Sequence, residues 1–182
     1  MSNFIDKIRE RVAIYKLESQ LKKSPRKKCL HNLNTATSAG ILYDATDEAN
    51  HKIVKDFIKE LKDNDIKSKA LGFINLKKRE DNYIGDSTHS FACKRDFSFF
   101  YTVKKEAIND FINQPFNLLI VLVKQQPFAI DYIGQLSKAE FKVGKAGLDN
   151  DLFDLMIELK ENDELPELKK QIVHYLKLLN NN

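Results

Sequence analysis

Residues 116–123, Phe-Asn-Leu-Leu-Ile-Val-Leu-Val, form a nearly continuous apolar segment between Pro115 and Pro127. A strand with one face in water alternates polar and apolar residues, whereas a strand covered on both faces is apolar throughout. Eight residues is an ordinary strand length and is short for a buried helix. The segment therefore predicts a central strand of a parallel sheet that carries helices on both faces.

Strand and helix patterns alternate through most of residues 38–180. Strands are predicted at 39–45, 68–74, 90–93, 116–123, 141–144 and 152–159, and helices from a cap at Thr46 or Asp47 to about 62 and at about 104–113, 128–137 and 164–179. This alternation predicts βαβ units, and hence one Rossmann-like α/β domain of three layers, α/β/α, with a largely parallel sheet of five or six strands. In such open sheets a ligand binds beyond the carboxyl ends of the strands.

A basic segment, residues 1–28, precedes this domain, which we place at 38–180. Residues 3–22 predict a helix, with an apolar stripe at Ile5, Ile8, Val12 and Tyr15 that ends before Ser24-Pro25. Nine Lys/Arg and three acidic residues give residues 1–28 a net charge of +6, and the chain total of +4 leaves −2 for the rest. The chain is thus expected to begin with a basic, protruding, amphipathic helix. A short basic connector follows, whose cations are Lys22, Lys23, Arg26, Lys27 and Lys28.

A charge asymmetry of this kind favours an anionic partner, and RNA or a ribosomal assembly is our first expectation. The apolar stripe must also be covered, and we favour its own domain or a protein partner over lipid. Acidic residues interleave with the cations and tryptophan is absent, so contact with a membrane surface is the weaker interpretation. The residues expected to contact the anionic partner are Lys22, Lys23, Arg26, Lys27 and Lys28.

Composition excludes several other classes of protein. At 182 residues with 31% charged residues, the chain fits one soluble domain with a real core. No apolar run approaches the ~20 residues that span a bilayer, and the first residues lack the apolar stretch of a secretory signal. The only cysteines, Cys29 and Cys93, stand in unrelated contexts, so we expect a reducing cytoplasm.

Polar residues at predicted strand ends are the candidate ligand-binding residues. Asp44, Thr46 and Asp47 follow the first strand, where a carboxylate can hold a cation or a ligand hydroxyl. The alternative, which we favour, is that Thr46 or Asp47 caps the next helix while Asp44 stays in solvent or binds loop amides. Lys145 lies in Gly-Lys-Ala-Gly, which can contact an anion or form a plain turn. Because no glycine-rich phosphate loop occurs, we predict no cofactor.

No catalytic signature is found. Cys29-x-His31 has the spacing of metal ligands, but no second pair follows, so we predict no metal site. His89 precedes Cys93 by four residues without a third orienting group, an arrangement that is usually incidental. Aromatic residues at 97 and 99–101 stand beside Lys94, Arg95, Lys104 and Lys105; they can stack nucleobases, but closing the core is the interpretation that we favour.

Four segments together resemble an uncharacterised family of small bacterial α/β proteins. They are Gly-Ile-Leu-Tyr-Asp-Ala-Thr (40–46), Ala-Leu-Gly-Phe-Ile (70–74), Phe-Ile-Asn-Gln-Pro-Phe-Asn-Leu-Leu-Ile (111–120) and Leu-Ser-Lys-Ala-Glu-Phe-Lys-Val-Gly (136–144). The resemblance implies a fold and little chemistry. A second one, over residues 116–144, is to the N-terminal domain of heptosyltransferase-type glycosyltransferases. Those enzymes bind nucleotide-sugar with a further domain that 182 residues do not include, so we expect no transferase activity.

Two functional hypotheses follow. The first is a non-enzymatic binding or adaptor protein that docks on an anionic surface through its basic helix. The second is a small enzyme that binds a nucleotide or sugar phosphate at the carboxyl ends of the strands. A deep cleft at those ends favours the second hypothesis, whereas a filled end and a free helix favour the first.

Overall fold

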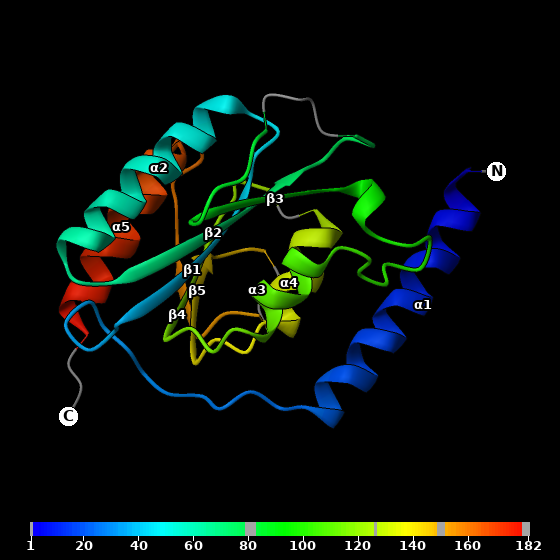
Figure 1. Ribbon diagram of the computed structural model, residues 1–182, viewed down its shortest axis with the longest axis horizontal. Coiled ribbons are helices and arrows are strands. Elements are labelled where there is room, and N and C mark those ends of the chain that lie inside the picture. The colour runs from blue at the N-terminus through cyan, green and yellow to red at the C-terminus, as the bar shows by residue number, and fades with distance from the viewer. Residues whose placement is uncertain (1, 79–82, 126, 149–151, 180–182) are drawn as a thin grey trace.

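The computed structural model describes residues 2–78, 83–125, 127–148 and 152–179 as a parallel sheet between two layers of helices (Figure 1). The strands are β1 (Ser38–Asp44), β2 (Lys67–Ile74), β3 (His89–Cys93), β4 (Leu118–Leu122), β5 (Phe141–Lys145) and β6 (Leu155–Ile157). The helices are α1 (Ser2–Lys23), α2 (Glu48–Asp63), α3 (Glu106–Asn113), α4 (Phe128–Leu136) and α5 (Leu165–Leu178), with a short 3₁₀ helix, η1 (Lys94–Asp96).

All six strands are parallel in the order β3-β2-β1-β4-β5-β6. The predicted α/β class and parallel sheet are therefore confirmed. Strand order runs outward in both directions from the β1–β4 pair, so β1 and β4 form the topological switch point. The predicted strand at 152–159 is too long, because only Leu155–Ile157 pair with β5 while Leu152 and Phe153 pack in the helical layer.

The predicted central strand is β4, and all five of its residues are buried. Leu118, Ile120 and Leu122 pack in the layer formed by α2 and α5. Leu119 and Val121 point the other way, toward α3 and α4. Because successive side chains of a strand face opposite sides, only a continuous apolar sequence satisfies both layers. Figure 1 shows α2 and α5 together on one side of the sheet and α1 on the far side of the molecule.

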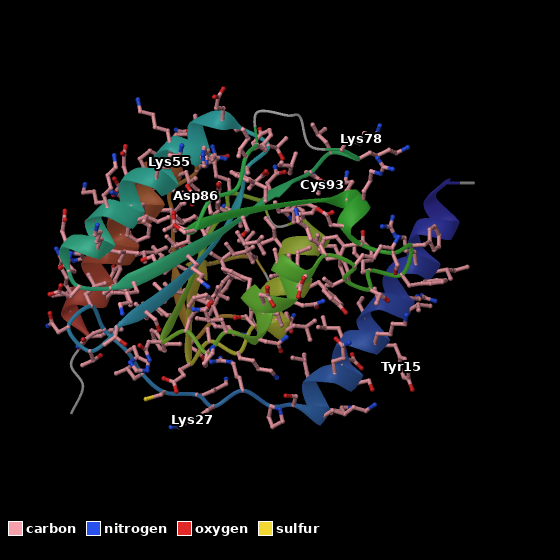
Figure 2. All side chains as sticks on the ribbon, in the orientation of Figure 1. Tyr15, Lys27, Lys55, Lys78, Asp86 and Cys93 are labelled. Carbon is pink, nitrogen blue, oxygen red and sulfur yellow. The ribbon has the colours of Figure 1, made fainter. Side chains whose placement is uncertain are left out.

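Helix α1 packs on its own domain rather than protruding. Ala13 is completely buried. Leu17 is 4% exposed and packs in the same apolar cluster as α3 and α4. Two residues of the predicted apolar stripe are wrongly assigned, because Ile8 is 44% exposed and Tyr15 is 74% exposed and points away from the body (Figure 2). Val12 is half-buried, and the side chain of Ile5 lies outside the described residues. The buried face is turned by about one residue, to Ala13 and Leu17, and Gln20 accepts a hydrogen bond from the Tyr132 hydroxyl at 3.3 Å.

A buried lysine caps the carboxyl-terminal end of α4. Lys142 of β5 donates from Nζ to the carbonyl oxygens of Gly134 and Gln135, at 2.7 and 3.0 Å. Carbonyls of a last helical turn lack partners within the helix, so the lysine satisfies two of them. Burial, aided by the charge of Arg26, lowers the pKa of Lys142 to about 7. Within the described residues, no helix combines the length and the apolar character that crossing a membrane requires.

Candidate functional site

The polar residues predicted at the end of β1 hold the loop between β1 and α2. An Asp44 carboxylate oxygen accepts a hydrogen bond from the Thr46 amide at 2.8 Å. The Thr46 hydroxyl oxygen accepts one from the amide of Asn75, just after β2, also at 2.8 Å. Asp47 is the N-cap of α2 and accepts from the Ala49 amide at 2.9 Å. These bonds fix the carboxyl edge of the sheet.

Lys145 lies at the same edge, at the end of β5 and two strands away from β1. Its Nζ donates to the carbonyl oxygen of Lys124, the residue that follows Val123 beyond β4, at 3.2 Å. The structure thus uses Lys145 to join two loops. It does not bring Lys145 into one cluster with the polar residues after β1.

A cleft of about 500 Å³ lies beyond the carboxyl ends of the strands. Its lining includes Phe73 of β2, Asn75 just after β2, and Lys94 of η1. The first residues of α4 and the side chain of Arg9 from α1 complete it. Four segments far apart in the sequence therefore meet at one place, which sequence analysis located only by its edge of the sheet.

Aromatic rings form a continuous lining in this cleft. The centroid of the Phe97 ring lies 6.1 Å from that of Phe73 and 6.3 Å from that of Tyr101. Tyr101 in turn approaches Phe128 to 4.4 Å. Tyr101 has φ = 57°, the left-handed region, which costs a bulky residue about 1–3 kcal/mol. This strain is held at the point where Tyr101 faces the cleft.

The charge of the lining is uniformly positive. Arg9, Lys77 and Lys94 line the cleft, and none of its described lining residues is acidic. The Arg9 guanidinium carbon lies 4.3 Å from the Tyr101 ring centroid, and its Nε donates to the Phe99 carbonyl oxygen at 2.5 Å. A guanidinium has five N–H donors, so Arg9 can keep this bond and still bind an anion.

The amino-terminal end of α4 also faces the cleft. Pro127 is its N-cap and makes no side-chain capping bond, and Phe128 and Ala129 are among the lining residues. The first amides of a helix lack partners within it and carry partial positive charge. The cleft thus combines three cations, a helix end and flat aromatic surfaces.

The predicted anion-contacting residues of the basic connector divide into two groups. Arg26 is engaged internally, since its guanidinium binds both carboxylate oxygens of Asp154 at 2.6 Å and donates to the Glu140 carbonyl oxygen at 2.8 Å. Lys28, 3.4 Å from Asp154, is 71% exposed in its side chain. The remaining lysines, Lys22, Lys23 and Lys27, are exposed, as Figure 2 shows for Lys27.

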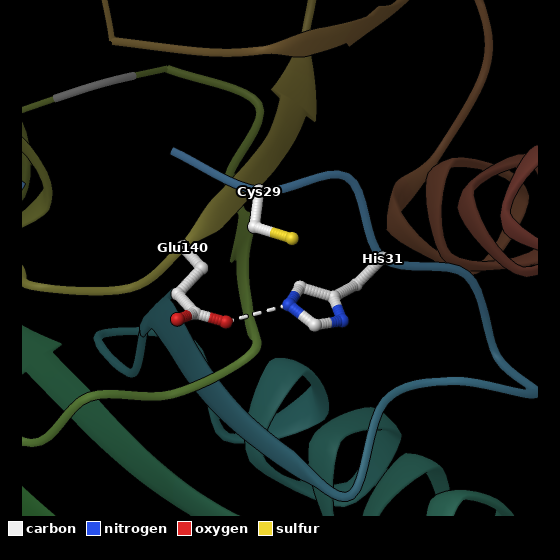
Figure 3. Close-up of side chains that lie close together, drawn as sticks. All are labelled: Cys29, His31 and Glu140. Atoms are coloured by element: carbon white, nitrogen blue, oxygen red, sulfur yellow. Dashed lines mark hydrogen bonds and ion pairs between the residues drawn. The ribbon is translucent and has the colours of Figure 1, made fainter. Parts of the chain in front are cut away.

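A cluster at the opposite, amino-terminal edge of the sheet joins Cys29 and His31 to Glu140 (Figure 3). His31 Nε2 lies 2.6 Å from Glu140 Oε2. This hydrogen bond lowers the pKa of the Glu140 carboxyl, and a second hydrogen bond, from Asn117, lowers it further. Sequence analysis noted the Cys-x-His spacing but missed Glu140, which comes from a segment 109 residues away from His31.

A second polar cluster, with two histidines, lies between α2 and the sheet. His51 of α2 accepts or donates a hydrogen bond with the Tyr43 hydroxyl at 2.7 Å, and its ring centroid is 5.2 Å from that of His89. His89 begins β3 and Cys93 ends it. Four strand residues span about 13 Å, so the two do not form a nucleophile–base pair.

These features define a wound α/β protein with a basic, aromatic cleft at the carboxyl edge of its sheet. Residues 9–179 match a family of unknown function, DUF6913, and the chain belongs to that family. Neither the curated proteins nor the solved structures include a significant match.

Proposed function

We propose that this protein binds a nucleotide, or a closely similar phosphate-bearing planar ligand, in the cleft lined by Arg9, Lys77, Lys94 and Phe128. The observation that carries the proposal is the combination of three cations and four aromatic rings without a lining acid among the described residues. A volume of about 500 Å³ lies within the usual range for small-molecule sites.

The position of the cleft supports this class of ligand. Open parallel sheets bind ligands beyond the carboxyl ends of their strands. The order β3-β2-β1-β4-β5-β6 is also the strand order of dinucleotide-binding folds, which makes a Rossmann-like relationship part of the proposal. The glycine-rich phosphate loop of those folds is absent from the sequence, so phosphate recognition here relies on side chains and the α4 amides.

Each part of the lining has a task in this proposal. Lys77, Lys94 and the first amides of α4 hold the phosphates, since charge-assisted bonds to anions are the strongest available. The base stacks on Tyr101 or Phe128, whose rings are already packed together. The described lining contains no carboxylate, histidine or cysteine, which favours binding over catalysis.

Titration of the full chain with ATP, ADP, adenosine and pyrophosphate tests the proposal, in buffer with EDTA so that no metal contributes. We expect the Lys94→Gln variant to bind ATP about 10-fold more weakly, the loss of one charged contact. Arg95→Gln is the matched control, because Arg95 is the exposed neighbour of Lys94 outside the cleft lining. If neither ATP nor ADP binds, or if both variants bind ATP equally, the proposal is wrong.

The exposed lysines of the connector support a second function, docking on RNA. Lys22, Lys23, Lys27 and Lys28 are exposed and lie within seven residues of sequence. Deleting residues 1–28 would remove the buried Ala13 and Leu17, so charge variants are the sharper test.

The two free cysteines support the further proposal of a reducing, cytoplasmic location.

Co-sedimentation with RNA across a salt series tests the docking function. Changing the four connector lysines to Gln is expected to weaken association and flatten its salt dependence, because fewer counterions are released. A control variant changes four exposed lysines of α2 instead, Lys52, Lys55, Lys59 and Lys62. Equal association of both variants would remove the idea.

A further inference from the structure

We propose that Cys29, His31 and Glu140 form a site for one divalent transition metal, with zinc as the expected ion and water as the fourth ligand. The three side chains offer a sulfur, a nitrogen and an oxygen atom, and these atoms all lie within 4.8 Å of one another (Figure 3). Three protein ligands and an open fourth position are the arrangement of zinc sites that remain accessible to solvent.

Small side-chain movements are sufficient to bring the ligands to bonding distance. Zinc bonds of about 2.0–2.3 Å in a tetrahedron separate neighbouring ligand atoms by roughly 3.3–3.7 Å. The distance between His31 Nε2 and Glu140 Oε2 is 2.6 Å and must increase by roughly 1 Å to reach this separation. Cys29 is exposed, so an ion can reach it from solvent, and its thiol must give up only a long contact of 3.7 Å to the Leu30 carbonyl oxygen.

The surrounding hydrogen bonds already orient the carboxylate. Asn117 Nδ2 donates to Glu140 Oε2 at 3.2 Å. The other end of this amide is fixed, because Asn117 Oδ1 accepts from the Thr37 amide and hydroxyl, both at 3.0 Å. The Cys29 amide donates to the Glu140 carbonyl oxygen at 3.2 Å, which keeps the two ligand-bearing segments together. Outer-shell partners of this kind are typical of metal sites.

The chemistry of the ligands selects the ion. A thiolate and an imidazole favour zinc, cobalt or copper, whereas magnesium and calcium prefer sites made of oxygen atoms alone. The charge of Lys27, which acts on Glu140, opposes a cation. With three ligands and this opposing charge, we expect weaker zinc binding than at a closed site of four cysteines.

The site is independent of the proposed cleft. Glu140 immediately precedes β5, Asn117 precedes β4 and Thr37 precedes β1, so the cluster lies at the amino-terminal edge of the parallel sheet. The cleft lies at the carboxyl edge. Failure of nucleotide binding therefore leaves the metal proposal standing, and the reverse also holds.

Titration of the reduced full chain with Co²⁺ and Zn²⁺ is the test. We expect one Co²⁺ per chain, with a sulfur-to-cobalt charge-transfer band that zinc abolishes by competition and magnesium does not. Cys29→Ser is expected to remove the band. Glu140→Gln and His31→Gln are expected to weaken binding by more than about 100-fold, beyond the typical effect of an outer-shell partner.

Two control variants separate this site from adventitious binding. Cys93→Ala removes the other cysteine and His174→Gln removes an exposed histidine, and both should bind cobalt as the unmodified chain does. Because Cys29 is exposed, Cys29→Ser should fold normally, which circular dichroism confirms independently of metal. Absence of stoichiometric binding, or an unchanged band in Cys29→Ser, overturns the proposal.

Discussion

Two neighbouring histidines, His51 of α2 and His89 of β3, are held as neutral rings by their surroundings. Burial, aided by Lys55, lowers the pKa of His51, and burial lowers that of His89. His89 Nδ1 faces the Thr88 hydroxyl at 2.9 Å and Asp86 at 3.5 Å, and these contacts do not offset the burial. Nε2 of His89 is one of two buried side-chain atoms in the described residues that have no hydrogen-bond partner.

The free energy of unfolding is therefore expected to fall in mild acid. Both pKa values are lower in the folded state than the ordinary 6.5, so the unfolded chain binds more protons below that pH. The stability that the two histidines supply is complete above about pH 6.5 and is lost as the pH falls toward their folded pKa values, by at most about 1.4 kcal/mol per pH unit for His89 and by less for the more exposed His51. Lys142, whose pKa is about 7 in the folded chain, adds a slope of the same sign mainly above pH 7. Urea denaturation between pH 7.5 and 5.5 measures this slope.

The variant His89→Asn assigns the slope to this cluster. Asn keeps a polar group near the position of Nδ1 but does not titrate, so the fall in stability toward pH 5.5 should be shallower than in the unmodified chain. The other groups that face the pair are Tyr43, Asp86, Lys55 and Glu48. Hydrogen bonds from Thr88 lower the pKa of Asp86, so it does not titrate in this window. Equal slopes in both proteins would contradict the assignment.

At the scale of elements, α1 shows that an apolar pattern in the sequence predicts where a helix lies more reliably than which face of the helix is buried. The buried positions, Ala13 and Leu17, are four residues apart, and Arg9 and Gln20 make polar contacts with the domain. Leu17→Ala is expected to lower the free energy of unfolding by about 2–5 kcal/mol, the usual cost of truncating a buried leucine. Tyr15→Ala should change it by less than about 0.5 kcal/mol.

Chemical denaturation of the two variants measures the difference. Comparable losses in both would show that Tyr15 is covered in solution, for example by a second copy or a partner. A loss confined to Leu17→Ala would agree with the exposed fraction of 74% for Tyr15 and with packing of α1 on its own domain.

The elements that sequence predicts well are those whose signal is local. The composition of residues 116–123 by itself indicates a strand that is buried on both faces, and this strand corresponds to β4 (Leu118–Leu122). The capping role of Asp47 is equally local. Arg9 in the cleft and Glu140 beside His31 are not, because each depends on chain segments about 90 or more residues apart meeting in space. A single sequence carries no signal for such pairings.

At the scale of the whole molecule, the sheet separates two polar sites. The cleft gathers residues that follow strands, and the Cys29–His31–Glu140 cluster gathers residues that precede them. Between them lie the buried residues of β4 and β1, whose one polar side chain over Ala39–Tyr43 and Leu118–Leu122, that of Tyr43, bonds His51 and contacts neither site. The two sites should therefore act without energetic coupling.

This independence is testable with the variants already described. Lys94→Gln should leave the affinity for Co²⁺ within about two-fold of the unmodified chain, and Glu140→Gln should leave the affinity for ATP equally unchanged, because distant sites couple by less than about 0.5 kcal/mol. The ATP titrations are made in EDTA and the cobalt titrations without nucleotide, since nucleotides chelate metals. A reciprocal effect of ten-fold or more would mean that the sheet transmits a change of structure between its edges, and the central strands would then have to shift together rather than form a fixed support.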